Sequence, residues 1–373
     1  MRKIKVAFCT DGVYPFALGG MQKHSRMLID ELSGYDDLEI TVIHPHTEIV
    51  FDNPEIEEIS LRCTNGGKNY VLECYNYSKR VYSAIMELNP DVIYSQGLSV
   101  WYGIKNLKKR TIVNPHGLEP YQAIGTREKI VTFPLRLALN NVIANSSVVI
   151  SLGGWLSEIL MRKCSRDGNV VVIPNGARDS FYQPKNENER REIRVLFLAR
   201  FAKNKGISIL FDAFDELQRR GLLDRFEFTL AGKGPLYNFY KSNNRHDNVQ
   251  LTGFVPDGEI ATLYKEHDLF LFPTLYEGMP TVVLEAMSFG LPIIVTDVGA
   301  TRELVDDSNG KVISPNSVDE LVESLKWFSE LTFSHRKDLA DSSLRKFRES
   351  FTWEKIAKRH HDLFKFLVAT KST

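Results

Sequence analysis

The sequence lacks several features that mark metal-binding, nucleic-acid-binding or membrane-spanning proteins. Its 373 residues include four cysteines, Cys9, Cys63, Cys74 and Cys164, without the paired spacing of a zinc site or disulfide framework. Basic and acidic residues balance at 47 each, so no net charge recruits nucleic acid. No apolar stretch approaches the roughly 20 residues that span a bilayer, and the N-terminal run Ile4–Cys9 is shorter than a signal-peptide core. We therefore expect a cytoplasmic protein with no bound metal and no nucleic-acid partner.

Several cofactor and nucleophile motifs are also missing. The sequence contains no Walker loop and no nucleophile elbow. The pair Gly19-Gly20 precedes a helical pattern, but no third glycine follows at the spacing of a dinucleotide-binding loop. The second expected strand, residues 39–44, does not end in an acid, which argues against an NAD-binding domain. His24, one turn into the helix, is expected to be packed or capping rather than catalytic.

Strand and helix patterns alternate along the chain, which indicates doubly wound parallel sheets. The length suits two domains of similar size. The halves open with similar strands, Ile4–Cys9 and Ile193–Ala199, both apolar enough for the centre of a sheet. Further strands are expected at 39–44, 92–95, 110–114, 148–152 and 170–173, and at 227–231, 249–252, 269–272, 293–296 and 311–313. The expected fold class is therefore α/β, with two Rossmann-like domains.

The domain boundary is expected between residues 177 and 190, where the polar stretch Gln183–Arg191 is typical of a linker. This gives an N-terminal domain of residues 1–180 and a C-terminal domain of residues 181–350. A final aromatic-rich helix is expected over residues 351–373.

Residues 273–297 carry the strongest functional signal. An apolar strand ends at Phe272, a loop follows, and a helix is expected from Thr281 to Phe289. Unpaired amides at the helix start would point out of the carboxyl edge of a parallel sheet, where anionic ligands bind. Glu277 lies in the loop, and Glu285 lies about 6 Å along the helix axis from Thr281. This arrangement suits a sugar joined to a phosphate.

The segment Glu277–Pro292 resembles the signature of two glutamates separated by seven residues in the retaining glycosyltransferases of family 4. Four further motifs of that family occur in the expected order, and the resemblance covers nearly the whole chain. They are Gly19-Gly20 after the first strand, Asn175-Gly176, the pair Arg200 and Lys205 after the strand that opens the second half, and the aromatic-rich segment 351–367. The resemblance implies the GT-B fold, in which two Rossmann-like domains face each other across a cleft. It also implies that the C-terminal helix, from about Trp353, crosses back onto the N-terminal domain.

The resemblance also implies roles for individual residues. Glu277 would hold hydroxyls of the donor sugar and Glu285 those of the ribose, while Arg200 and Lys205 would neutralise the diphosphate. His116, after the strand expected at 110–114, would contact the donor sugar near its reacting carbon, and we do not assign it as a general base. The other expected donor-site residues are Gly19, Gly20, Gly232, Phe254, Val255, Gly278, Met279, Pro280, Thr281 and Val282.

The sequence has no Asp-x-Asp motif, which holds a metal on the nucleotide in the single-domain glycosyltransferase fold. We therefore expect no cofactor, with helix amides and the two cations meeting the charge of the leaving group. The expected reaction transfers a glycosyl group from a UDP- or GDP-sugar to a saccharide or lipid-linked saccharide, with retention of configuration. Two alternatives stay open: a GT-B enzyme of other chemistry, such as a nucleotide-sugar epimerase or a phosphorylase, and a non-catalytic nucleotide-sugar-binding protein.

The N-terminal half also contains basic segments with interspersed apolar residues. Residues 101–110 mix aromatics with four cations, and Arg127, Lys129 and Arg136 follow between residues 126 and 140. These segments predict a weak peripheral contact with anionic lipid, at the inner face of the membrane. A solvated basic helix is the alternative.

Overall fold

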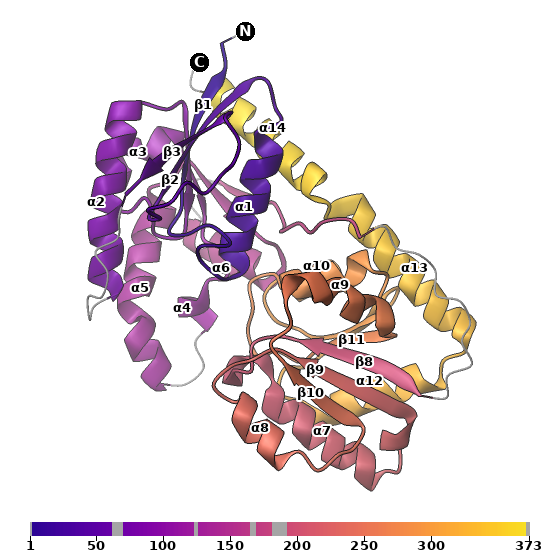
Figure 1. Cartoon of the computed structure of the whole chain (residues 1–373). Coiled ribbons are helices and arrows are strands. Elements are labelled where there is room, and N and C mark those ends of the chain that lie inside the picture. The colour runs from indigo at the N-terminus through magenta and orange to yellow at the C-terminus, as the bar shows by residue number, and fades with distance from the viewer. Residues whose placement is uncertain (1, 62–69, 123–125, 165–168, 181–191, 371–373) are drawn as a thin grey trace. The chain divides into compact units, whose positions relative to one another are not determined.

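The computed structural model describes residues 2–61, 70–122, 126–164, 169–180 and 192–370. The chain forms two compact units, one of Met1–Asn175 with Trp353–Thr373 (unit 1) and one of Gly176–Thr352 (unit 2). The expected linker, Gln183–Arg191, lies outside the described residues. Figure 1 shows in each unit a sheet with helices on its two faces. Both sheets are parallel throughout, so the expected class of two Rossmann-like folds is confirmed.

Unit 1 has a seven-stranded sheet in the order β3-β2-β1-β4-β5-β6-β7. Its inner strands are apolar and buried, as parallel strands covered on both faces must be. The edge strand β3 was not expected from the sequence, because its residues IEEIS carry two glutamates. The strands are β1 (Ile4–Cys9), β2 (Leu38–His44), β3 (Ile56–Ser60), β4 (Val92–Gln96), β5 (Thr111–Asn114), β6 (Val148–Ser151) and β7 (Val170–Val172).

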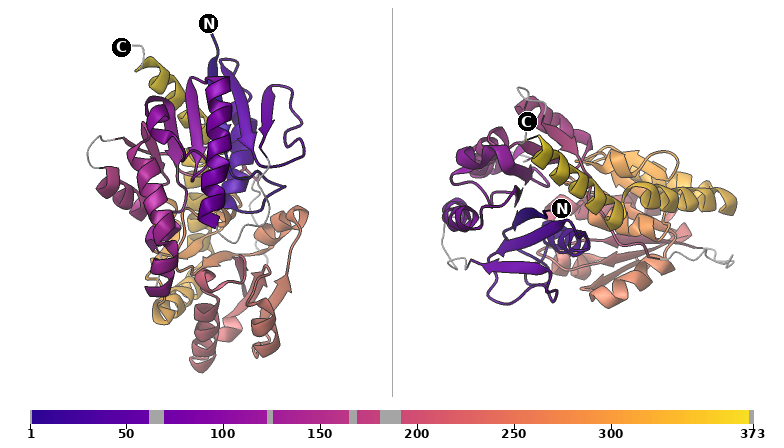
Figure 2. Two further views of the ribbon diagram at one scale, coloured as in Figure 1. Left: turned by 90° about the vertical axis from the view of Figure 1, so that its left-hand side faces the viewer. Right: turned by 90° about the horizontal axis from the view of Figure 1, so that it is seen from above.

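The helices of unit 1 include one from the far end of the chain. Helix α14 lies beside α1 (Figures 1 and 2), and its Ile356, Phe364 and Leu367 are buried in the same core as Phe8 of β1. The helices are α1 (Gly20–Leu32), α2 (Tyr70–Leu88), α3 (Ile104–Leu107), η1 (Lys108–Arg110), α4 (Glu119–Gln122), α5 (Thr126–Ala144), α6 (Gly154–Cys164) and α14 (Trp353–Ala369). The core of unit 1 is therefore built from both ends of the sequence.

Unit 2 has a six-stranded sheet in the order β10-β9-β8-β11-β12-β13. Its strands are β8 (Ile193–Leu198), β9 (Phe226–Ala231), β10 (Val249–Gly253), β11 (Leu269–Phe272), β12 (Ile293–Thr296) and β13 (Gly310–Ile313). Its helices are η2 (Lys203–Lys205), α7 (Ile207–Arg219), η3 (Leu223–Arg225), α8 (Tyr237–Asn243), α9 (Asp257–Glu266), α10 (Thr281–Ser288), α11 (Thr301–Leu304), α12 (Val318–Glu330) and α13 (Phe333–Ser350).

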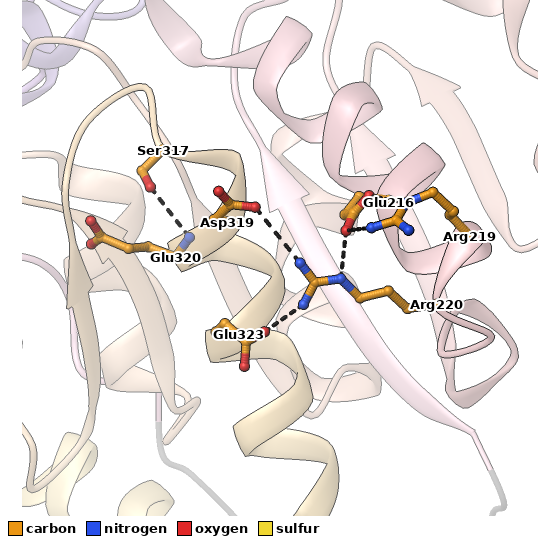
Figure 3. Close-up of polar contacts among 7 residues, drawn as sticks. All are labelled: Glu216, Arg219, Arg220, Ser317, Asp319, Glu320 and Glu323. Atoms are coloured by element: carbon orange, nitrogen blue, oxygen red, sulfur yellow. Dashed lines mark hydrogen bonds and ion pairs between the residues drawn. The ribbon is translucent and has the colours of Figure 1, made fainter.

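A surface ion-pair network joins α7 to α12 on unit 2 (Figure 3). Arg220, just after α7, donates to Glu216 at 2.5 Å and to Glu323 of α12. Hydrogen bonds from Arg219 and then Arg220 lower the pKa of the Glu216 carboxyl to about 2. The network links α7 to α12, two helices that also pack against each other.

The strand orders fix where ligands bind. In each sheet the chain runs outward from a central strand in one direction and then resumes on its other side, between β1 and β4 in unit 1 and between β8 and β11 in unit 2. Loops that leave the carboxyl ends of two such strands diverge and open a crevice, the usual ligand site of open α/β sheets.

Candidate functional site

Lys205 and Glu277 meet at the point where β8 and β11 diverge in unit 2. The Lys205 ammonium donates to Oε1 of Glu277, although 72 positions separate the two residues. Thr274, which follows β11, lies with its Oγ1 at 3.3 Å from the same carboxylate oxygen and donates to the carbonyl of Asn204 at 2.9 Å. Two expected site residues, one from each loop, are therefore brought together.

A glycine lets the first of these loops lie against the second. Gly206 has φ +73°, and a Cβ there would stand 1.9 Å from the carbonyl oxygen of Pro273. The amide of Leu275 donates to the Asn204 carbonyl at 2.8 Å, which joins the two loops by a backbone hydrogen bond. Only glycine combines this backbone angle with this close approach. Gly206 thus sets the position of Lys205.

Arg200 lies two residues after the end of β8 and is exposed. Within the part of the chain that the structure describes, it forms no ion pair with a carboxylate, in contrast to Lys205. A guanidinium offers a planar fork of donors that fits phosphate oxygens. The two expected cations therefore differ: one is held by Glu277, and the other is open to a ligand.

The loops after β9 and β10 reach the same edge of the sheet. The amide of Gly232 donates to the Gly253 carbonyl at 2.7 Å, and a Cβ on Gly232 would stand 1.9 Å from the carbonyl oxygen of Ala199. Phe254 follows, with 68% of its surface exposed, and Val255 is half-buried. An exposed aromatic ring beside a tight backbone turn is suited to stacking on a flat base.

Helix α10 presents its N-terminus at this edge. It begins at Thr281 after Pro280, and no side chain caps it. The first amides of an α-helix have no partner within the helix, so those of Thr281 and Val282 are available to an anion. The Met279 side chain is buried, which leaves only its backbone to serve a ligand.

Glu285 is oriented by a residue that the sequence analysis missed. The Tyr264 hydroxyl, on α9, lies 3.0 Å from Oε2 of Glu285 and 3.2 Å from the carbonyl oxygen of Val282. Burial, followed by the charge of Glu285, raises the pKa of Tyr264 well above its usual range. The phenol therefore stays protonated as a donor. From the sequence, Tyr264 could be recognised only as an apolar position of a helix, which does not indicate a contact with Glu285.

Gly299 is a second missed residue. It lies after β12 with φ +54°, and a Cβ there would stand 2.3 Å from the carbonyl oxygens of both Glu277 and Gly278. The neighbouring amide of Ala300 donates to the Gly278 carbonyl at 2.8 Å. The segment after β12 therefore packs against the loop that carries Glu277 and holds its backbone in place.

Unit 1 has its own pocket of about 430 Å³ at the divergence of β1 and β4. The loops after β1, β4 and β5 line it, together with the start of α1 and one face of α5. Gly20 and His116 of the expected site line this pocket, whereas Gly19 is the N-cap of α1. Asp11 and Glu119 supply carboxylates, and no lysine or arginine is among the described residues that line it.

His116 is held in an unusual backbone conformation at this pocket. Its φ is +55°, and its amide donates to Oδ1 of Asn114 at 3.0 Å. Burial, and then the neighbouring His360, lower the pKa of His116 to about 3, so its imidazole is neutral. Its buried Nε2 has no hydrogen-bond partner among the described residues. His116 therefore lines the pocket as a neutral ring rather than as a cation.

A buried polar cluster lies behind His116. His24, expected to be packed, is 1% exposed, with its ring 4.9 Å from that of His116. The Tyr94 hydroxyl lies 3.2 Å from Nε2 of His360 and accepts a hydrogen bond from Asn114 at 3.0 Å. This cluster joins the pocket wall to α14.

Asp11 is the second perturbed group at the pocket. Loss of hydration raises the pKa of its carboxyl to about 6, although a hydrogen bond from Gln22 opposes the shift. A carboxylate of this kind accepts hydroxyl hydrogen bonds and repels anions. The pocket is therefore suited to an uncharged, hydroxyl-rich ligand.

Two family models match the chain in succession. The model described as Glycosyltransferase Family 4 matches residues 18–181, and the model described as Glycosyl transferases group 1 matches residues 179–345. The first covers most of the described part of unit 1 before α14, and the second covers nearly all of unit 2.

Individual relatives extend the same picture. The chain is 26% identical over 351 residues to an uncharacterised glycosyltransferase of Methanocaldococcus jannaschii, covering 92% of this chain and 93% of the other. It is 28% identical over 244 residues to TuaC of Bacillus subtilis, a glycosyltransferase that its name assigns to teichuronic acid biosynthesis; this match covers 62% of this chain but spans only 59% of TuaC.

Two solved structures have the same fold. Sucrose-phosphate synthase from Thermosynechococcus elongatus superposes with a TM-score of 0.80 at 18% identity, covering 99% of this chain and 100% of that one. Anabaena HepE, solved in complex with UDP and glucose, superposes with a TM-score of 0.71 at 19% identity, covering 97% and 99%. No described helix is both long and apolar enough to cross a membrane.

Proposed function

The chain belongs to the family 4 glycosyltransferases, and from this membership we propose that it is a retaining hexosyltransferase. It takes a glycosyl group from a UDP- or GDP-sugar and transfers it to a hydroxyl of a saccharide or lipid-linked saccharide. The product belongs to a polysaccharide or glycoconjugate. The observation that carries this proposal is the pairing of Lys205 with Glu277 beside the N-terminus of α10.

The donor lies along the sheet edge of unit 2 in this proposal. Its base stacks on Phe254, its ribose hydroxyls donate to Glu285, and its diphosphate is met by Arg200 and the first amides of α10. Tyr264 supports the role of Glu285, because a hydrogen-bonded carboxylate keeps one orientation. HepE, with UDP and glucose bound, is a structural precedent for such a donor on this fold.

The reaction is a same-face substitution at the anomeric carbon. The bond from that carbon to the diphosphate oxygen breaks, the acceptor oxygen forms the new bond on the same face, and the acceptor proton passes to the departing phosphate. Negative charge that accumulates on the diphosphate is met by Arg200, Lys205 and the α10 amides. The acceptor enters the pocket of unit 1, where the carboxylates of Asp11 and Glu119 accept hydrogen bonds from its hydroxyls.

The test combines a ligand screen with product analysis. A thermal-shift screen across UDP, GDP, ADP and their common sugars identifies the donor, because a ligand that binds only the folded state raises its melting temperature. Transfer is then measured with and without EDTA, and the anomeric proton coupling of the product is read by NMR. We expect metal-independent transfer with the donor's configuration kept.

Four outcomes would contradict the proposal. Strict dependence on added manganese or magnesium would contradict the proposal that protein groups alone neutralise the diphosphate. A product of inverted anomeric configuration would contradict the retaining mechanism. Formation of an epimer from the nucleotide sugar without acceptor would favour the epimerase alternative. Nucleotide binding without turnover of any donor would favour a binding protein.

A further inference from the structure

Helix α5 of unit 1 is apolar on two opposite faces. One face packs into the unit: Ala138, Leu139 and Val142 are 2%, 6% and 0% exposed. The other face is open: Ile130, Phe133 and Leu137 are 69%, 56% and 52% exposed, at the i, i+3, i+7 spacing of a single stripe. Val131 beside them is 69% exposed. Single exposed apolar residues need no explanation, but a stripe along one helix indicates a binding surface.

The charge around this stripe identifies what it binds. Lys129 and Arg136 are exposed and lie along one side of the stripe, by their helical positions. Neither forms an ion pair with another described side chain, and Arg136 lies 4.9 Å from the centroid of the Tyr121 ring. The sequence of α5 contains one acidic residue, Glu128, in its first turn. A second copy of the chain would bring like charges together across a symmetric contact, which is unfavourable. An anionic bilayer surface instead satisfies both the apolar stripe and the cations.

We propose that α5 docks unit 1 on anionic membrane surfaces, with Ile130, Phe133 and Leu137 inserted among the lipid headgroups and Lys129 and Arg136 against their phosphates. The other basic segment expected to contact lipid includes residues 105–110, which lie in α3 and η1 and are not part of α5. Helix α5 is thus the element that makes the contact.

Docking through α5 has a consequence for the acceptor that rests on the proposed function. Thr132, Leu135 and Leu139 of the same helix line the pocket of unit 1. A helix with its side chains is about 10 Å across, so the pocket lies within roughly that distance of the docked surface. A saccharide linked to a lipid in the bilayer can therefore reach the pocket without leaving the membrane.

The test is vesicle flotation of the full chain at low salt. Vesicles of phosphatidylcholine alone are compared with vesicles that also contain phosphatidylglycerol. We expect the protein to float only with the anionic vesicles and to lose at least about tenfold in partitioning in the triple variant Ile130→Ser/Phe133→Ser/Leu137→Ser. The double variant Lys129→Glu/Arg136→Glu should lose binding similarly, because it leaves the apolar stripe intact but reverses the charge.

A matched control removes exposed apolar residues elsewhere: Ile49→Ser/Met86→Ser/Phe239→Ser, with native exposures of 81%, 51% and 61%. This control should float like the native chain, and all variants should keep its melting temperature. Thermal shift with UDP and GDP, whose proposed site is in unit 2, reports on the proposed function separately. If neither nucleotide raises the melting temperature of the native chain, the proposed transferase function is weakened, but the proposed membrane contact is not affected.

Other outcomes would overturn the membrane proposal. If the native protein stays at the bottom of every gradient, α5 does not bind anionic membranes. Flotation that survives in both α5 variants would assign the contact to another element. A dimer in light scattering that the triple variant converts to monomer, without flotation of the native chain, would make α5 a contact between copies.

Discussion

Lys205 and Glu277 hold each other by an ion pair across the two loops that diverge from the centre of the unit 2 sheet. Each side chain is mostly shielded from water, with 22% and 15% exposed, so neither charge is well hydrated. A diphosphate offers the lysine a stronger anionic partner, and a sugar offers the carboxylate several hydroxyl donors. We therefore expect donor binding to exchange this internal pair for two contacts with the ligand.

The two glutamates should separate in their effects. Glu285→Gln should weaken binding of free nucleoside diphosphate, because the ribose is common to donor and product. Glu277→Gln should leave that affinity nearly unchanged while lowering turnover on the order of a hundredfold, since its proposed partner is the sugar. Isothermal titration with the nucleotide and steady-state kinetics with the donor measure the two quantities. Equal losses of nucleotide affinity would show that this division of roles is wrong.

Tyr264→Phe provides an intermediate case. It removes the hydroxyl that lies 3.0 Å from Glu285 and leaves the carboxylate in place. We expect a loss of nucleotide affinity smaller than that of Glu285→Gln, of about 1 kcal/mol for one hydrogen bond. The same titration measures it, and an unchanged affinity would mean that the tyrosine does not orient the glutamate.

The cations should matter more for turnover than for binding. Arg200→Ala or Lys205→Ala each removes a fixed partner of the leaving group, which typically costs on the order of 3 kcal/mol, or roughly a hundredfold in rate. Lys203→Ala is the control, because it removes an exposed lysine from the same short helix, η2. Turnover at saturating donor checks this. A comparable loss in the control would point to a general charge effect.

Gly206→Ala should destabilise unit 2 through a backbone clash. The variant places a methyl group 1.9 Å from the Pro273 carbonyl oxygen at φ +73°. Gly221→Ala is a matched control, because Gly221 has φ +66° but open space around its Cβ position. The control should cost about 1 kcal/mol from the backbone angle alone, and Gly206→Ala should cost several times more. Urea unfolding compares them, and equal values would show that the loop yields at no cost.

Acid should destabilise unit 1 through its buried histidines. Burial lowers the pKa of His360 to about 4 and that of His24 well below its usual range, whereas an unfolded histidine titrates near pH 6.5. Between these values the unfolded chain binds more protons. The free energy of unfolding is therefore fully retained above pH 6.5 and falls by about 1.4 kcal/mol per pH unit per histidine as the pH decreases. Asp11, with its pKa raised to about 6, opposes part of this trend.

The pH profile is checked by urea unfolding at several values between pH 7 and pH 4. His360→Phe should flatten the slope, whatever it does to the stability at pH 7, because it removes one titrating group. The control His335→Asn changes an exposed histidine and should leave the slope unchanged. A native profile that is flat from pH 7 to pH 5 would contradict the neutral, buried state of the cluster.

The central strands and the donor loops could be predicted from sequence because their patterns are local. Strand Leu269–Phe272 is a run of four apolar residues, and the helix after it was predicted to within one residue of its observed end. Strand β3 could not be predicted this way, since its Glu58 faces inward to accept hydrogen bonds from the amides of Val50 and Phe51. Its pattern is polar because its partners are polar.

Contacts between residues that are far apart in the chain could not be predicted from the sequence. Nothing near Tyr264 indicates that its hydroxyl meets a carboxylate 21 positions later, and nothing near Gly299 indicates that it packs against the loop of Glu277. Such contacts depend on which strands are neighbours in the sheet. The sheet order, rather than any motif, brings them together.

The insertion of α14 into the core of unit 1 bears on how the chain is synthesised. Ile356, Phe364 and Leu367 are synthesised only after the whole of unit 2, yet they complete a core begun by β1. Unit 2 is one continuous stretch of sequence, so it can close while α14 is still being made. Until α14 is synthesised, the apolar residues of unit 1 that pack against it stay exposed to solvent. A chain truncated before Trp353 would therefore combine a folded unit 2 with an incompletely packed, aggregation-prone unit 1.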